Sequence, residues 1–255
     1  MIGLTFSGTG NSRYALECFL RELGGNAAAL SIEDPQAAAH IPQHEDIVFS
    51  YPVQYSEVPK FLKDFIHQHA ALWRGKKVFI IATMALFSGD GAGVLARLLQ
   101  SYGAIITGGL HLQMPDSIAD EPVLKRSPQR NAQLVAKATA KIRKAAAAFK
   151  EGRSPRQGLG FLSRMAGLLT QRFWFGHKTR RYHSGLKVNA GLCVGCGKCE
   201  QLCPTGNITL REGKAVGHAR CTLCYRCVNR CPVKAITLLG KAVVEQTTVD
   251  KHLKP

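Results

Sequence analysis

Eight of the nine cysteines lie between Cys193 and Cys231, where they repeat one spacing twice. Each copy reads C-x-x-C-x-x-C-x-x-x-C-P, and the second copy follows the first at an offset of 28 residues. Thiolates are ligands of soft metals, and three of them at this spacing can surround one centre from a single tight loop. The fourth cysteine of each copy precedes a proline and is carried away from that loop. The repeat therefore predicts two metal centres whose ligands are shared between the copies.

This spacing resembles the ligand run of bacterial two-cluster ferredoxins, in which the fourth cysteine of each copy binds the other 4Fe-4S cluster. The resemblance implies two 4Fe-4S clusters and these ligand sets: Cys193, Cys196, Cys199 and Cys231 for one, and Cys221, Cys224, Cys227 and Cys203 for the other. Zinc is the main alternative, but structural zinc sites usually use two C-x-x-C pairs separated by a long loop. Disulfides are disfavoured because no export signal is seen at the start of the chain.

Length and composition are those of a globular protein with one large domain, or with a medium and a small one. The chain has 255 residues, of which 45% are hydrophobic and 20% charged. Its longest uncharged apolar stretch, 78–87, is too short to span a bilayer and is typical of a buried strand. No signal peptide is recognised, so we expect a cytoplasmic protein.

The N-terminal 150 residues alternate between apolar strand-like runs and segments with helical periodicity. This alternation predicts a parallel α/β sheet with helices on both faces. The expected strands are 2–6, 27–32, 46–51, 77–83 and 104–112, and the expected helices are 11–23, 58–69, 91–102 and a long one from Pro128. Ser127 and Pro128 are a cap and first-turn pair for that long helix, which Gly152 ends.

A glycine-rich turn follows the first expected strand and leads into a helix. Backbone amides and short hydroxyls meet there, which is typical of a phosphate site; its residues are Ser7, Gly8, Thr9, Gly10, Asn11 and Ser12. The turn lacks the lysine of a P-loop, and Arg13 stands where a dinucleotide fingerprint has its third glycine. A neutral cradle suits the phosphate monoester of flavin mononucleotide (FMN). A tight turn without a ligand is the alternative.

Residues 6–12 resemble the flavodoxin phosphate loop, and together with the cysteine repeat the chain is similar to flavodoxin–ferredoxin fusions of bacteria and archaea. The resemblance implies the strand order 2-1-3-4-5 and an FMN ring flanked by the loops after strands 3 and 4. Those loops supply Tyr51, Pro52, Val53, Tyr55, Thr83, Met84, Phe87 and Gly89. Tyr55 and Phe87 are the candidates for stacking on the ring, and the loop 114–117 is expected to line a cleft beside it.

The expected fold is thus a doubly wound parallel α/β sheet of the flavodoxin type with a C-terminal α+β two-cluster ferredoxin domain. We expect the FMN domain at 1–152, a basic and partly helical connector at 153–185, the cluster domain at 186–240 and a tail without a usable pattern at 241–255. A connector helix over 159–175 would place Phe161, Leu162 and Met165 on an apolar stripe that packs between the domains. A helix lying on a membrane surface, supported by Trp174 and the basic residues that follow, is the alternative.

Clusters pass single electrons, whereas a flavin can hold one or two, so the two together predict an electron-transfer oxidoreductase. The expected partner is an electron-donor protein of the ferredoxin or reductase type, and the acceptor is a small substrate or a second protein. The formal net charge of +17 favours an acidic partner, an anionic substrate or peripheral contact with an anionic membrane over nucleic acid. A pure carrier between proteins and a redox sensor remain alternatives.

Overall fold

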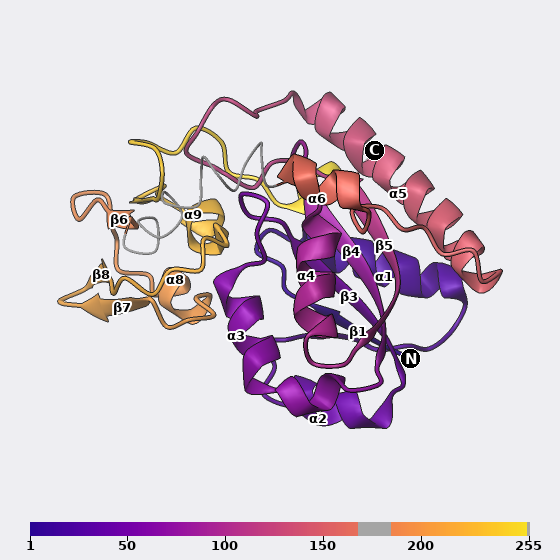
Figure 1. Cartoon of the computed structure of the whole chain (residues 1–255). Coiled ribbons are helices and arrows are strands. Elements are labelled where there is room, and N and C mark those ends of the chain that lie inside the picture. The colour runs from indigo at the N-terminus through magenta and orange to yellow at the C-terminus, as the bar shows by residue number, and fades with distance from the viewer. Residues whose placement is uncertain (168–184, 254–255) are drawn as a thin grey trace.

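The computed structural model describes residues 1–167 and 185–253 (Figure 1). Its larger part is a parallel sheet of five strands, β1 (Ile2–Thr5), β2 (Ala29–Ser31), β3 (Asp46–Pro52), β4 (Lys77–Met84) and β5 (Ile105–Gln113). The strands lie in the order β2-β1-β3-β4-β5, which is the flavodoxin-like order and confirms the prediction. In such sheets the ligand binds outside the carboxyl ends of β1 and β3, where the strand order reverses.

Helices cover both faces of this sheet. Two of them, α1 (Asn11–Leu23) and α5 (Pro128–Lys150), pack on one face, and α3 (Lys60–Gln68) and α4 (Gly91–Gln100) pack on the other. Because side chains alternate along a strand, Phe49 of β3 joins the core beneath α3 and α4, whereas Val48 joins the core beneath α1 and α5. Short turns of helix, α2 (Ala37–His40), η1 (Ile41–Gln43) and η2 (Ala70–Trp73), connect β2 to β3 and α3 to β4.

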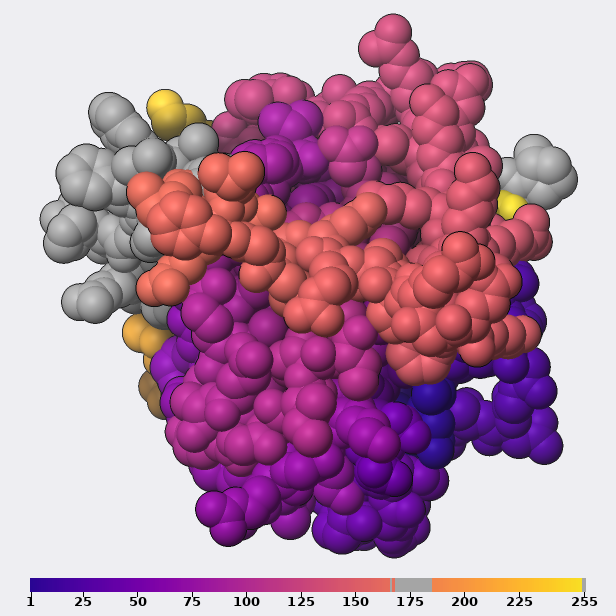
Figure 2. Space-filling view, turned by 45° about the vertical axis from the view of Figure 1, so that its right-hand side comes forward, coloured from indigo at the N-terminus to yellow at the C-terminus, as the bar shows by residue number. Residues whose placement is uncertain are grey.

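The chain after α5 runs back along the edge of the sheet. The amide of Gly109 in β5 donates to the carbonyl of Pro155, so this segment pairs with part of the outer edge of β5. Figure 2 shows the segment as an orange-pink band over the surface formed by α4, and it ends in α6 (Phe161–Gly167). The side chains of Phe161 and Leu162 are 73% and 83% exposed. The predicted packing of this stripe is therefore wrong for its first turn, and the rest of the expected helix, with its basic residues, lies outside the described residues.

The C-terminal part is built from two short antiparallel pairs and two short helices. β6 (Lys187–Val188) pairs with β9 (Ile236–Thr237), and β7 (Ile208–Arg211) pairs with β8 (Lys214–Gly217). α8 (Lys198–Gln201) and α9 (Arg226–Arg230) begin 28 residues apart, so the cysteine repeat is also a structural repeat. The chain then returns to the sheet domain through η4 (Val249–His252), which contacts α5. No helix within the described ranges is long and apolar enough to cross a membrane.

Candidate functional site

The glycine-rich turn lies at the carboxyl end of β1, where the flavodoxin-like order predicts a ligand. Gly10 adopts φ 95°, a left-handed conformation that glycine reaches without strain, and α1 begins at the next residue. The amide N–H groups of residues 8–12 have no acceptor within the described part of the chain. These donors lie together at the N-terminal end of a helix, where the helix dipole favours an anion. The turn can therefore hold a phosphate group.

Hydrogen bonds fix the side chains of this turn to the loops that follow β4 and β5. The hydroxyls of Thr9 and Ser117 lie 2.7 Å apart, and those of Ser12 and Thr83 lie 2.8 Å apart. The amide nitrogen of Asn11 donates to the carbonyl of Pro115 at 2.8 Å. Since the turn contains no lysine or arginine between residues 7 and 12, an anion there would be held by neutral donors.

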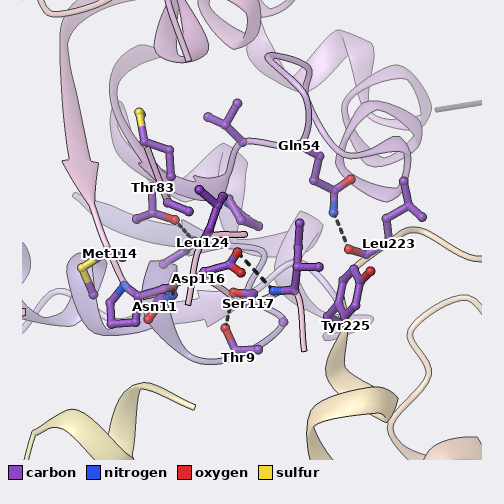
Figure 3. Close-up of a pocket in the computed structure, with 18 of the residues that line it drawn as sticks. Thr9, Asn11, Gln54, Thr83, Met114, Asp116, Ser117, Leu124, Leu223 and Tyr225 are labelled. Atoms are coloured by element: carbon purple, nitrogen blue, oxygen red, sulfur yellow. Dashed lines mark hydrogen bonds between the residues drawn. The ribbon is translucent and has the colours of Figure 1, made fainter. Parts of the chain in front are cut away.

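A pocket opens next to the turn, between the sheet domain and the cysteine-rich domain (Figure 3). Most of the residues predicted to hold FMN line it, namely Ser7, Gly8, Thr9, Asn11, Ser12, Pro52, Val53, Tyr55, Thr83, Met84 and Phe87. The predicted loop after β5 lines it too, through Met114, Pro115, Asp116 and Ser117. Both candidate stacking residues are thus at the pocket, and the side chain of Phe87 is 53% exposed. An elongated planar group that carries a phosphate fits these walls.

Three of the predicted residues do not line this pocket. Tyr51 is fully buried in the core, where its hydroxyl donates to the carbonyl of Gly91. Gly89 lies against α6, because a Cβ at this position would be 2.5 Å from the amide nitrogen of Gly167. Gly10 shapes the turn, and a Cβ there would be 2.6 Å from Cγ1 of Val249. Close packing between segments explains both glycines.

Sequence reasoning missed one wall of the pocket, which comes from the second cysteine copy. Leu223, Cys224 and Tyr225 line it. Leu223 and Tyr225 have φ values of 56° and 58°, in the left-handed region that costs a side chain about 1 kcal/mol or more. At the matching positions of the first copy, 28 residues earlier, the chain has Gly195 and Gly197, also with positive φ. The second copy therefore keeps the same loop conformation and places two side chains at the pocket. The backbone of these two residues is strained as a result.

The two domains meet tightly at the turn. A Cβ on Gly8 would lie only 2.0 Å from the carbonyl oxygen of Cys224, so the backbones touch there. Next to it, the guanidinium of Arg226 forms a two-pronged ion pair with Glu33 at 2.5 and 2.6 Å and donates to the carbonyl of Ser7 at 2.8 Å. The bond to Glu33 raises the pKa of Arg226. These contacts hold this part of the cysteine-rich domain against the glycine-rich turn of residues 7–12, which we call the phosphate turn after its predicted ligand.

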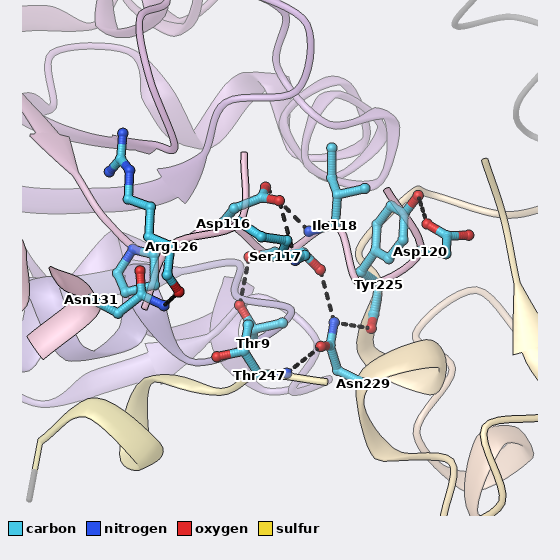
Figure 4. Close-up of polar contacts among 12 residues, drawn as sticks. Thr9, Asp116, Ser117, Ile118, Asp120, Arg126, Asn131, Tyr225, Asn229 and Thr247 are labelled. Atoms are coloured by element: carbon cyan, nitrogen blue, oxygen red, sulfur yellow. Dashed lines mark hydrogen bonds and ion pairs between the residues drawn. The ribbon is translucent and has the colours of Figure 1, made fainter. Parts of the chain in front are cut away.

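A buried carboxylate anchors the same interface. Asp120, in the loop between β5 and α5, accepts the hydroxyl of Tyr225 at 2.9 Å (Figure 4). Its other oxygen accepts three successive amides, those of Leu238, Leu239 and Gly240, at 2.5 to 3.1 Å. Four donors thus satisfy one carboxylate that has only 3% exposure. Burial is the main cause of the raised pKa of Tyr225, with the negative charge of Asp120 adding to it.

The C-terminal tail, in which no usable pattern was recognised, crosses the interface as a strap over residues 244–252. The amide of Val249 donates to the carbonyl of Thr9 at 3.0 Å. The amide of Thr247 donates to the side chain of Asn229 at 2.7 Å, and that side chain donates in turn to the carbonyl of Ser117 at 2.8 Å (Figure 4). The strap therefore ties α9, the loop after β5 and the phosphate turn together.

The eight cysteines of the repeat line two separate hollows, four in each. One hollow is lined by Cys203, Cys221, Cys224 and Cys227, and the other by Cys193, Cys196, Cys199 and Cys231. We call them the proximal and distal sets, because Cys224 belongs to the pocket wall and no distal cysteine does. Within the described residues, no three metal-binding side chains converge as a single ion would require. Four cysteines on each hollow are the number of thiolate ligands that a 4Fe-4S cluster takes.

Burial affects the thiols of the proximal set strongly. It raises the pKa of Cys224 to about 12 and raises the pKa of Cys221 and Cys227 as well. These thiols are therefore protonated at neutral pH when no metal is bound. Since metals bind thiolates, loading this set must release protons.

Comparisons with known proteins bear on both parts of the chain. Residues 192–235 match the family model of the 4Fe-4S dicluster domain. The chain thus joins a sheet domain with the flavodoxin-like strand order to a segment that resembles 4Fe-4S dicluster domains. Among solved structures, it is similar to a two-electron reduced flavodoxin of Megasphaera elsdenii, with 21% identity over 55% of this chain and 99% of that one and a TM-score of 0.42. A Bacillus cereus flavodoxin 2 is 19% identical over 59% of this chain and 97% of that one, with a TM-score of 0.44. No curated protein matches the chain.

Proposed function

We propose that this flavodoxin-like and dicluster fusion passes electrons between two 4Fe-4S clusters, held by the proximal and distal cysteine sets, and an FMN held in the interdomain pocket. The flavin supplies an acceptor of one or two electrons, which the clusters alone lack. The observation that carries this proposal is the contact between the phosphate turn and the proximal set. Cys224 is at once a predicted cluster ligand and a wall residue of the predicted FMN pocket.

The residues of the chain support each part of this proposal. The amides of residues 8–12, which have no acceptor among the described residues, suit the phosphate. Tyr55, Phe87 and Met114 give the pocket an apolar lining for a ring. The two hollows, each lined by four cysteines, suit two clusters. Because the strap and Asp120 fix the domains to each other, the proximal set is kept beside the pocket without a domain movement.

A second hollow adjoins the pocket and favours a small acceptor over a pure carrier role. It shares Met84, Leu86 and Phe87 with the pocket, and it is also lined by Lys137 and Lys141 of α5. An apolar surface with two cations at one side suits a small anionic molecule. A reduced flavin in the pocket would lie next to such a molecule, so we propose that the final acceptor is a small substrate.

The composition of the purified protein tests the cofactors. We expect anaerobically isolated protein to contain about eight iron atoms and eight sulfide ions per chain, as two cubanes require, together with one FMN. Iron, sulfide and flavin assays against protein concentration measure this. Colourless protein, or protein that contains zinc in place of iron, would contradict the proposal.

Removal of one distal ligand tests the relay. We expect the change Cys196→Ala to lower the iron content and to slow the reduction of the flavin by a ferredoxin-type donor at least about 10-fold, a loss of about 1.4 kcal/mol in barrier terms. Cys18→Ala is the matched control, because Cys18 is a buried thiol in the core beneath α1 and α5. The control should keep its iron and its rate. Flavin reduction at the normal rate in the Cys196→Ala protein would defeat the relay.

The ion pair at the interface predicts two potential shifts of opposite sign. Arg226 lies between two proximal ligands, so the change Arg226→Gln removes a positive charge and should lower the potential of the proximal cluster. Glu33→Gln leaves the arginine without its counter-charge and should raise it. Tens of millivolts are expected in each case, since 59 mV corresponds to about 1.4 kcal/mol for one electron. Redox titration followed by electron paramagnetic resonance measures both, and shifts of the same sign would contradict the assignment.

A further inference from the structure

The distal cysteine set faces away from the pocket. Figure 1 shows β6, β7 and β8 at the end of the molecule farthest from the five-stranded sheet, whereas α9 lies on the side of the sheet domain. Cys196 of the distal set is exposed, and no cysteine of the proximal set is. An electron that arrives from another protein therefore has its shortest path through the distal set.

Two exposed apolar side chains lie beside the distal set. Leu192 and Val194 flank the ligand Cys193, and they are 51% and 63% exposed. Val194 also lines the distal hollow. Exposed apolar side chains at the centre of a polar surface are typical of protein contact sites.

Four exposed lysines belong to the segments that build this part of the molecule. We call them the basic rim; its members are Lys187, Lys198, Lys214 and Lys234. Lys198 lines the distal hollow, and Lys214 donates to the carbonyl of Cys193 at 2.6 Å. Lys187 lies on β6. This strand pairs with β9, which begins at Ile236, shortly after Lys234.

Acidic residues do not balance the rim. Residues 186–240 contain only Glu200 and Glu212 against eight lysines and arginines. One oxygen of Glu200 already accepts the amide of Leu210 at 3.2 Å. The surface around the distal set is therefore positive, and long-range attraction can steer a negative partner toward it.

We propose that this surface, Leu192 and Val194 with the basic rim, docks an acidic one-electron carrier protein. The inference rests on the proposed function and adds the place where electrons enter. In the docked complex one electron leaves the reduced centre of the carrier and enters the distal cluster. The carrier is oxidised by one electron and the distal cluster is reduced by one, with no bond made or broken and no proton moved. From the distal cluster, the electron would continue to the proximal set and then to the pocket.

A charge-reversal pair on the rim tests this surface without replacing a predicted ligand. The test variant is Lys187→Glu with Lys234→Glu, and its matched control is Lys144→Glu with Lys150→Glu, two exposed lysines of α5. The probe is a reduced acidic plant-type 2Fe-2S ferredoxin, mixed anaerobically with each loaded protein in a stopped-flow instrument. Iron and flavin assays first establish that all three proteins carry the same cofactors.

We expect the second-order rate constant for cluster reduction to fall about 10-fold or more in the rim variant at low salt. The difference should shrink toward nothing near 0.5 M salt, where charges are screened within about 4 Å. The control variant should lose no more than about twofold. A normal rate in the rim variant, or an equal loss in the control, would overturn the proposal. Anionic vesicles that bind the unmodified protein but not the rim variant, with ferredoxin rates unchanged, would also overturn it in favour of a membrane.

Dithionite separates this proposal from the relay on which it rests. As a small reductant it does not need the docking surface, so it should reduce the clusters of the rim variant and the unmodified protein alike. If dithionite-reduced clusters fail to reduce the flavin of the unmodified protein, the proposed function fails. The docking surface is then still judged by the ferredoxin rates alone.

Discussion

The change Gly8→Ala is expected to slow electron transfer between the clusters and the flavin about 10-fold, which corresponds to about 1.4 kcal/mol in barrier terms. The added methyl group would lie 2.0 Å from the carbonyl oxygen of Cys224, and neither backbone can yield without moving its loop. Since Gly8 belongs to the phosphate turn and Cys224 to the proximal set, the methyl group would push the two predicted cofactors apart. Small increases in separation weaken electron tunnelling steeply. Flash or stopped-flow reduction of the flavin after anaerobic reduction of the clusters measures the loss.

Gly25→Ala is the control for this prediction. Gly25 lies in the loop after α1, and a Cβ there would meet nothing within 4 Å. It should therefore leave the rate unchanged, which separates the contact with Cys224 from any general effect of replacing a glycine. Rapid flavin reduction in the Gly8→Ala protein, with both cofactors present, would show that the turn does not touch the proximal set.

The change Asp120→Ala is expected to destabilise the protein by about 3 to 5 kcal/mol. Asp120 accepts four hydrogen bonds, and such bonds to a charged group contribute about 1.5 to 3 kcal/mol each, with losses that do not add fully. Its removal leaves the amides of residues 238–240 and the hydroxyl of Tyr225 without their acceptor. We expect the cysteine-rich domain to unfold at lower urea concentration than the sheet domain, so that one transition splits into two.

The neighbouring change Glu121→Gln is the matched control. It removes one negative charge from the same loop, and no hydrogen bond of this side chain is present among the described residues. Urea unfolding followed separately by cluster absorbance and by far-ultraviolet circular dichroism distinguishes the domains. A single unchanged transition in the Asp120→Ala protein would mean that the carboxylate does not hold the interface.

Much of the fold could be predicted because its patterns are local or repetitive. The five strands carry apolar runs such as those around Phe49 and Ile80, and both cores use the alternation that these runs predict. The two hollows are lined by the same two groups of four cysteines that the resemblance to two-cluster ferredoxins implies as ligand sets. The glycines of the phosphate turn could be recognised because few sequences suit a turn that binds phosphate at the start of a helix.

The interface could not be predicted, because nothing periodic marks it. In the sequence, Asp120 is one of several acidic loop residues. Its role depends on backbone amides that lie more than 100 residues later in the chain. The strap residues Thr247 and Val249 have no motif at all. Which cysteine set lies beside the pocket was also hidden, although Leu223 and Tyr225, where the first copy has glycines, were a signal that the copies differ. The expectation for Tyr51 was misleading too. The alternation of side chains along β3 places Tyr51 on one face of the sheet, but it does not tell whether that face borders the pocket.

The walls of the pocket come from segments that lie far apart along the chain. Residues 7–12 are synthesised long before Leu223, Cys224 and Tyr225, which form the opposite wall, and before the strap. A ribosome that has finished the sheet domain has therefore built the turn but not the opposite wall. The pocket can be completed only after the second cysteine copy has been synthesised, and a nascent chain that stalls before that copy cannot close it.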